Sequence, residues 1–284
     1  MIAFLYSLPD LSVAIVFSTV AAVAFAAAPL LRAWIFGEVS EASSEFARTT
    51  MTAITGFTGA VLAFSLVQAQ GNLRAVERMV ATEAMQLHQM DRILASYGDE
   101  RVVAIRESVR TYAKSVVADE WPRLAEGGRS QLTADLFHTL SQRILAIEPT
   151  PGRQTIVYGD LVKIADQLAE SRQDRLSAID LALPPIYWET IGSLMVLLIT
   201  FSAFIEPRRA VSLGGLGIGL ALLATLVFIF DQPFLGDVSV TPDPFVKALL
   251  VMGDHAVSSP LMPPGANSSS SHPQESYPTP SPRS

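Results

Sequence analysis

Four long apolar stretches, set as two pairs around a charged middle region, constrain this chain more than any other feature. The first pair covers about residues 11–34 and 51–68, and the second pair covers about residues 186–205 and 211–230. A helix of about 20 apolar residues crosses the roughly 30 Å hydrocarbon core of a bilayer. The sequence therefore predicts an all-α membrane protein with four transmembrane helices and a helical soluble insert between the two pairs.

The composition agrees with a membrane protein and excludes several classes of function. Half of the residues are apolar and 17% are charged, whereas about a quarter are charged in a typical soluble protein. The chain has no cysteine, which excludes disulfides, thiolate metal sites and a cysteine nucleophile. A net charge of −7 argues against binding to nucleic acid, which requires concentrated basic residues. The lipid bilayer is therefore the expected partner, and no nucleic-acid partner is expected.

Composition also divides the chain into four segments. Residues 1–70 hold the first pair of spans, and residues 71–183 carry charged residues with apolar positions at three- and four-residue steps, which indicates helices. Residues 184–253 hold the second pair of spans and a short amphipathic helix. Residues 254–284 are rich in serine and proline and are predicted to be a disordered tail. Four spans place the N-terminus, the insert and the tail on one side of the membrane.

The second span, about residues 51–68, carries two neighbouring stripes. One stripe is bulky and consists of Ile54, Phe57, Val61 and Phe64. The other is small or weakly polar and consists of Thr52, Thr55, Gly56, Gly59 and Ala63. Small residues let helices approach closely in lipid, which indicates helix packing. A bulky apolar stripe can instead line a pore as a constriction that excludes water. The residues alone favour packing over a pore.

The fourth span contains a pair of glycines four residues apart, Gly215 and Gly219. Such a GxxxG pair lets two backbones approach closely in lipid, because no side chain separates them. The sequence therefore predicts that this face of the fourth span packs tightly against another helix.

Reactive chemistry is sparse. No span carries an ionisable residue at its centre, and the insert has no recognised catalytic, phosphate-binding or metal-binding motif. The sequence therefore predicts no enzyme, no catalytic residue, no cofactor and no metal site. Carboxylates in the insert are interpreted as the solvated faces of amphipathic helices, with arginines as partners; they include Glu77, Glu83, Asp91 and Glu107.

Two acidic segments have alternative interpretations. Asp119-Glu120-Trp121-Pro122 is predicted to terminate a helix of the insert, with Trp121 packed on the bundle. Asp231, Asp237 and Asp243 follow the last span and supply oxygen ligands that a hard cation prefers. Their spacing lacks the order of a calcium loop, so turn and capping roles are favoured, with Asp243 as the N-cap of a short helix.

Charges beside the spans do not decide which side of the membrane the insert faces. Lysine and arginine concentrate on the cytoplasmic side of membrane proteins. The two short loops within the pairs carry Arg32, Arg48, Arg208 and Arg209. The insert and the segment after the last span carry a comparable set at Arg74, Arg78, Arg172, Arg175 and Lys247. Charge therefore leaves both orientations open.

Three motifs, taken in order, resemble one family. The first motif is Tyr112-x-x-x-Val116-x-x-Asp119-Glu120-Trp121. The second is Arg172-x-x-Arg175-Leu176, followed by Leu183-Pro184 and Trp188. After the last span comes Phe230-Asp231-x-Pro233-Phe234-x-Gly236, with Pro242 downstream. These motifs resemble the bacterial DUF4239, or bestrophin-like, membrane protein family. The resemblance covers about residues 11–252 and is most specific in the Phe-Asp-x-Pro-Phe-x-Gly element.

The resemblance implies an activity that the residues alone do not. It implies a homo-oligomer, specifically a pentamer, that conducts small anions across the bacterial inner membrane. It also implies that the insert lies on the cytoplasmic side and that the second span lines a hydrophobic neck, with Ile54, Phe57, Val61 and Phe64 as the pore-lining residues. The acidic cluster of the calcium-gated animal members is missing, because the three aspartates after the last span are spread out.

Two hypotheses of different kinds follow. The first is a bestrophin-like oligomeric anion channel or pore. The second is a membrane-anchored scaffold or sensor whose helical insert binds a partner protein, without transport.

Overall fold

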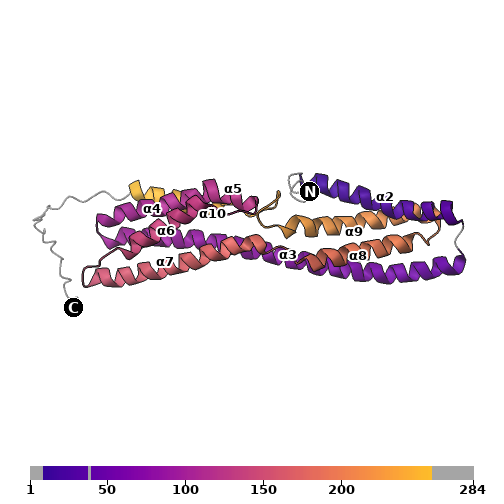
Figure 1. The fold of residues 1–284 in the computed structure, drawn as a ribbon, viewed down its shortest axis with the longest axis horizontal. Coiled ribbons are helices and arrows are strands. Elements are labelled where there is room, and N and C mark those ends of the chain that lie inside the picture. Colours follow the sequence, from indigo (N-terminus) through magenta and orange to yellow (C-terminus); the bar gives the residue numbers. More distant parts are fainter. Residues whose placement is uncertain (1–8, 38–39, 258–284) are drawn as a thin grey trace, which may run out of the picture.

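The structure is a computed structural model that describes residues 9–37 and 40–257. Every regular element in these described ranges is a helix, and no strand occurs among them. Two helical bundles lie end to end and share one long helix, α3 (Figure 1). The predicted all-α fold class is therefore confirmed.

One bundle is formed by the apolar helices. It consists of α2 (Asp10–Phe36), the first half of α3 (Glu41–Tyr97), α8 (Pro185–Ser202) and α9 (Ala210–Asp231). Four helical segments of the described residues are long and apolar enough to cross a membrane, and each contains one of the predicted spans. The short 3-10 helix η3 (Pro207–Arg209) connects α8 to α9. The protein is therefore a membrane protein with four spans in two pairs.

Helix α3 is continuous from the membrane into the insert. It has 57 residues, which corresponds to a length of about 85 Å at 1.5 Å per residue. The helix crosses the predicted segment boundary between residues 70 and 71 without a break. Near this boundary the Asn72 amide donates to the carbonyl of Leu181 and accepts from Gln68, so polar side chains are satisfied where the helix leaves the apolar region. The second span and the first insert helix are thus one element.

The insert forms the second bundle around the other half of α3. This bundle contains α4 (Arg101–Ser115), the π-helix η1 (Val116–Glu120), α5 (Trp121–Ala125), α6 (Gln131–Leu145) and α7 (Arg153–Ser177) from the insert, and also α10 (Asp243–Val257), which follows the last span. Its core is apolar and draws on most of these helices, with buried residues such as Val80, Leu87, Val109, Leu140, Leu161 and Phe245. The insert therefore has a hydrophobic core of its own, separate from the cluster between the membrane helices.

Two helix ends differ from the predictions. The helix expected to stop at Asp119-Glu120-Trp121-Pro122 instead continues through η1 into α5 and ends at Ala125. Pro122 lacks the N–H that a regular α-helix would use, and the hydrogen-bond pattern changes at this point. Helix α10 continues to Val257, four residues into the predicted tail of 254–284. The rest of that tail lies outside the described residues.

The tightest packing between membrane helices joins α2 to α9. A Cβ atom added to Gly217 would lie 2.9 Å from the carbonyl oxygen of Ala21 and 2.9 Å from the ring of Phe25. By contrast, a Cβ atom at Gly215 or Gly219 would meet nothing within 4 Å. Within the single chain, Gly215 and Gly219 therefore do not form a packing face. The close approach uses the neighbouring face of the same helix.

Candidate functional site

The four predicted pore-lining residues separate into two pairs. Phe57 and Phe64 are 61% and 75% exposed and lie on the side of α3 that no other membrane helix covers. Ile54 and Val61 are half-buried against the cluster between the membrane helices. The members of each pair are seven positions apart and therefore share a helix face. Phe57 and Val61, from different pairs, point in directions about 40° apart around the helix axis. The pore-lining role remains a prediction, and Phe57 and Phe64 are the two members that face outward.

The uncovered side of α3 is smooth and apolar around the two phenylalanines. Gly56, Ala60 and Ala63 are exposed on it, and none of them carries a polar side-chain atom. The nearby hydroxyl groups of Thr58 and Ser65 are buried and donate to carbonyl oxygens of the preceding turn at 2.8 and 2.9 Å. The side that packs on the other helices thus carries the polar groups, and the uncovered side is apolar.

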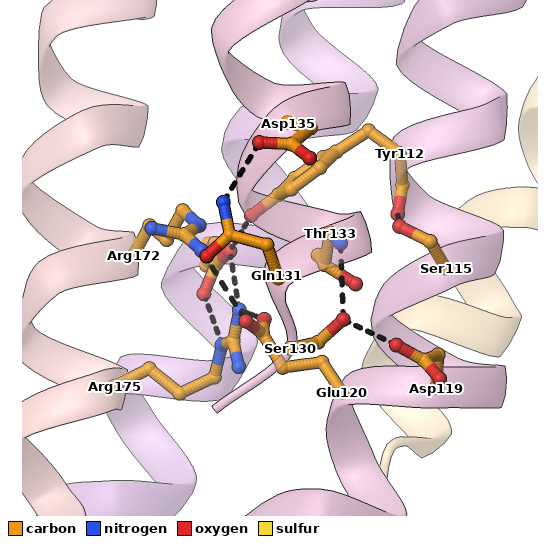
Figure 2. Close-up of polar contacts among 11 residues, drawn as sticks. Tyr112, Ser115, Asp119, Glu120, Ser130, Gln131, Thr133, Asp135, Arg172 and Arg175 are labelled. Carbon is orange, nitrogen blue, oxygen red and sulfur yellow. Dashed lines mark hydrogen bonds and ion pairs between the residues drawn. The ribbon is translucent and has the colours of Figure 1, made fainter. Parts of the chain in front are cut away.

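The insert holds a buried ion network, which consists of Glu83 from α3, Tyr112 from α4, Glu120 from η1, and Arg172 and Arg175 from α7 (Figure 2). At its centre the Arg175 guanidinium donates to Glu83 from Nε at 2.6 Å and from Nη2 at 3.2 Å. The same Nη2 atom donates to Glu120 at 2.7 Å. Arg175 therefore joins carboxylates that lie on two different helices.

Two further donors complete the buried network. The Tyr112 hydroxyl donates to Glu83 at 2.7 Å, and Arg172 donates to the second oxygen of Glu120 at 3.2 Å. Glu83, Glu120 and Arg175 are 0% exposed. The two carboxylates are balanced by two guanidinium groups, which is the condition under which charges are tolerated in an apolar core.

The surroundings of Tyr112 and Arg175 determine the protonation states of these two side chains. Burial raises the pKa of the Tyr112 hydroxyl well above its usual range, and the negative charge of Glu83 raises it further. Burial alone would lower the pKa of Arg175, but its charge and hydrogen-bond interactions with Glu83, Tyr112 and Glu120 together outweigh burial, so its pKa is raised. At neutral pH Tyr112 is therefore a neutral donor and Arg175 is a cation. The buried network is therefore a charge-balanced element that joins α3, α4, η1 and α7.

Asp119 and Trp121 flank Glu120 in sequence but make different contacts. Asp119 accepts from the Ser130 hydroxyl, which lowers the pKa of this carboxyl group, and from Arg123 at 3.3 Å. Ser130 also caps α6 by accepting from the backbone N–H of Thr133 at 3.0 Å. The ring of Trp121 packs edge-on against Phe234 and Phe245. The motif thus directs three successive side chains to three different neighbours.

The segment after α9 joins the two bundles. Asp231 accepts from the backbone N–H of Leu183 at 2.6 Å and from the indole N–H of Trp188 at 3.1 Å. The half-buried Phe230 contacts the apolar clusters of both bundles. Asp231 therefore ties the end of the last span to the start of α8. We refer to Phe230, Asp231, Pro233, Phe234 and Gly236 as the joint segment.

The rest of the joint segment directs the chain into the insert. The carbonyl of Pro233 accepts from the N–H of Val240 at 2.9 Å, and Gly236 has a φ of 89°, which favours glycine. Phe234 then packs on Trp121 with ring centroids 5.8 Å apart. A residue with a side chain would be strained at Gly236, which accounts for the glycine in this motif.

The three aspartates after the last span lie apart and make separate contacts. Asp231 accepts the two hydrogen bonds above, Asp237 accepts from the backbone N–H of Asp10 at 3.3 Å, and Asp243 is the first residue of α10. Among the described residues, no three acidic or histidine side chains converge as ligands for a metal ion.

Sequence reasoning missed two buried carboxylates in α3. Glu83 and Asp91 were interpreted as solvated, but they are 0% and 1% exposed. Asp91 accepts two hydrogen bonds from Arg106, both at 2.9 Å. A signal was present, because Glu83 lies three residues after Val80 and four before Leu87, in the apolar seam of the helix. The interpretation of these two residues was therefore wrong.

Comparison with known proteins identifies the family. The sequence matches the Bestrophin-like domain over residues 18–245, which is most of the chain. The protein belongs to the bestrophin-like family. No curated protein shows significant sequence similarity to it. A crystal structure described as that of a membrane protein aligns with 84% of this bestrophin-like chain and 98% of its own chain, with 15% identity and a TM-score of 0.44.

The matched region of this bestrophin-like protein runs from α2 to the start of α10. It therefore includes the uncovered side of α3, the buried network and the joint segment. The residues on which the family resemblance rested now have positions in the fold. Tyr112, Glu120, Arg172 and Arg175 form the buried network, while Asp231 and Trp188 connect the bundles.

Proposed function

We propose that this bestrophin-like protein is an oligomeric anion channel of the bacterial inner membrane, in which α3 of each protomer lines the pore. The observation that carries the proposal is the uncovered apolar side of α3, where Phe57 and Phe64 are exposed in the single protomer. Membership of a family known for channels supports it. A ring of protomers, five by the family resemblance, would bring these sides together around a common axis.

The chemistry of α3 is consistent with this role. Rings of phenylalanine at two successive levels would form an apolar constriction, which gates by excluding water. Between Arg48 and Arg74 the helix carries no charged residue, so the proposed constriction lies in an uncharged stretch of α3.

Chloride flux into liposomes that contain the purified protein tests the proposal. Because the phenylalanine rings would limit water entry, the double substitution Phe57→Ala/Phe64→Ala is expected to raise chloride flux severalfold over the unsubstituted protein. The matched control is Val20→Ala/Val23→Ala, which shortens two exposed side chains on α2, away from the proposed pore. This control is expected to leave flux unchanged.

Two outcomes would contradict the channel. The first is a protein that stays monomeric and passes no chloride, and the second is an equal rise in flux for both double variants. A chain without flux that retains a partner protein through residues 73–180 would support the alternative of a membrane-anchored scaffold or sensor.

A further inference from the structure

A pocket of about 330 Å³ opens at the end of the membrane bundle that carries the short loops. It lies between α3, the last residues of the α8 segment, η3 and the start of α9. Its polar wall consists of Arg48, Thr52 and Thr55 from α3, Arg209 from η3 and Ser212 from α9. Two guanidinium groups and three hydroxyl groups therefore surround one space.

The remaining wall of this pocket is apolar. Met51, Ile205 and Leu213 are buried and line it, together with the half-buried Leu216. These residues belong to the cluster between the membrane helices, so the apolar wall continues toward the hydrocarbon region. The pocket is thus amphiphilic, with positive charge at one end and apolar surface at the other.

The two arginines of the pocket are available to a ligand. Arg48 and Arg209 are exposed, and within the described part of the chain neither forms an ion pair. Arg32 at the same end differs, because its guanidinium lies 5.0 Å from the ring of Phe204 and donates to the carbonyl of Gly37 at 3.4 Å. Only an anion would match the two unpaired guanidinium groups.

The depth of the pocket in the bilayer identifies the source of that anion. Arg48 precedes Gln68 by about six helical turns, or about 30 Å along α3, which equals the thickness of the hydrocarbon core. With Gln68 and Asn72 at one surface, Arg48 lies at the headgroup level of the opposite leaflet. Basic pockets between membrane helices at this level suit phospholipid headgroups.

We propose that this pocket binds a membrane phospholipid through its phosphate group. Arg48 and Arg209 donate to the phosphate oxygens, the Ser212 hydroxyl adds a donor, and the first part of an acyl chain lies along Met51 and Leu213. The site does not depend on channel activity. Arg48 and Phe57 are turned by about 180° on α3, so the lipid would lie on the opposite side of the helix from the proposed pore.

Lipid binding to the full-length protein in detergent tests the site. Phosphatidylglycerol is compared with a diacylglycerol that has the same acyl chains but no phosphate, and bound lipid is measured by native mass spectrometry. The unsubstituted protein is expected to prefer phosphatidylglycerol. Because charge-assisted hydrogen bonds are lost, Arg48→Gln/Arg209→Gln is expected to bind it at least about tenfold more weakly.

Two further variants keep the test independent of folding defects. Arg208→Gln removes the same charge from the adjacent exposed residue, which does not line the pocket, and it is expected to bind as the unsubstituted protein does. Ser212→Asp retains both arginines but places a negative charge in the pocket, so it is expected to weaken binding. The size-exclusion profile of each variant reports its folding.

The proposal is overturned if the double arginine variant retains full binding, or if Arg208→Gln loses as much. It is also overturned if diacylglycerol binds as tightly as phosphatidylglycerol. Inorganic phosphate that binds at these arginines while phosphatidylglycerol does not would likewise overturn it, because the source would then be a free ion.

Discussion

Glu83 places a carboxylate in the apolar core of the insert, where it is tolerated because Arg175 and Tyr112 donate to it. Removing an ionised carboxylate from water costs several kcal/mol, and a paired cation must offset this cost. Each charged group of the buried network therefore offsets the cost of burying an oppositely charged group. The network also specifies the packing, since it joins α3, α4, η1 and α7 at one level.

The buried network gives a prediction at the scale of one residue. Glu83→Gln keeps the shape of the side chain but leaves an excess of buried positive charge on Arg175 and Arg172. The substitution is expected to lower the free energy of unfolding by about 3 kcal/mol. Urea unfolding of the protein in detergent micelles, followed by tryptophan fluorescence, to which Trp121 of the insert contributes, provides the measurement.

Glu77→Gln is the matched control, because Glu77 is an exposed carboxylate on the same helix. It is expected to change the free energy of unfolding by less than about 0.5 kcal/mol. Equal effects of the two substitutions would show that the buried network does not stabilise the insert.

The sequence predicts apolar burial at this scale better than polar burial. Val109 and Leu161 belong to the apolar positions at three- and four-residue steps that indicated helices in the insert, and both are 0% exposed. Glu83 and Arg175 form an ion pair although they are 92 positions apart in the chain, and no local sequence pattern predicts such a pairing. The family motif did include Arg172 and Arg175, but their partners could be identified only once the helices were packed.

At the scale of elements, α3 illustrates what spacing can and cannot predict. Its buried positions form one continuous seam that includes Met51, Leu62, Ala69, Val76, Val80 and Leu87. Inside the membrane this seam contains large, small and polar residues together. The bulky stripe and the small stripe of the second span are more uniform, so they were easier to recognise in the sequence than the buried seam. There is no proline near residue 70, and Gly71 is accommodated inside the helix, so the change from apolar to charged composition marks a change of environment within one element.

The α2–α9 pair gives a prediction about helix packing. Gly217→Ala places a methyl group 2.9 Å from the Ala21 carbonyl oxygen, so the two helices must move apart. It is expected to destabilise the protein by about 1–3 kcal/mol, the usual cost of overpacking. Gly219→Ala meets open space and is expected to be neutral or slightly stabilising, since alanine favours a helix.

Thermal unfolding of the two glycine variants in the same detergent measures this difference. A lower melting temperature for Gly217→Ala only would support the packing face described above. The opposite order would show that Gly219 forms the close contact, as the GxxxG spacing had predicted. The spacing could not distinguish the two faces because both carry glycine, at Gly214 and Gly217 and at Gly215 and Gly219.

At the scale of the whole molecule, two bundles share α3 and meet at the joint segment (Figure 1). Asp231 bonds to the start of α8, while Phe234 packs on Trp121 in the insert. The insert and the membrane helices are therefore connected at two places, through α3 and through the joint segment. This arrangement was partly predictable: the order of spans and insert followed from composition, whereas the long-range contacts of Asp231 did not.

The orientation of the molecule in the membrane gives the last prediction. We expect the insert to lie in the cytoplasm, in keeping with the proposed channel, although arginines beside the spans are similar in number on the two sides. The chain has no cysteine, so a single Thr139→Cys substitution introduces a unique thiol. Thr139 is exposed on α6, and its hydroxyl donates only to the carbonyl of Asp135 in the preceding turn, so the change leaves the core intact.

An impermeant maleimide is expected to label Thr139→Cys only after the inner membrane has been permeabilised. Glu206→Cys, at an exposed residue of the short loop between α8 and η3, serves as the matched control on the other side and is expected to react in intact spheroplasts. Labelling of the insert before permeabilisation, with no reaction at residue 206, would reverse the orientation. The reversed orientation would place Arg48 and Arg209 in the cytoplasmic leaflet, so the same experiment decides which leaflet supplies the proposed phospholipid.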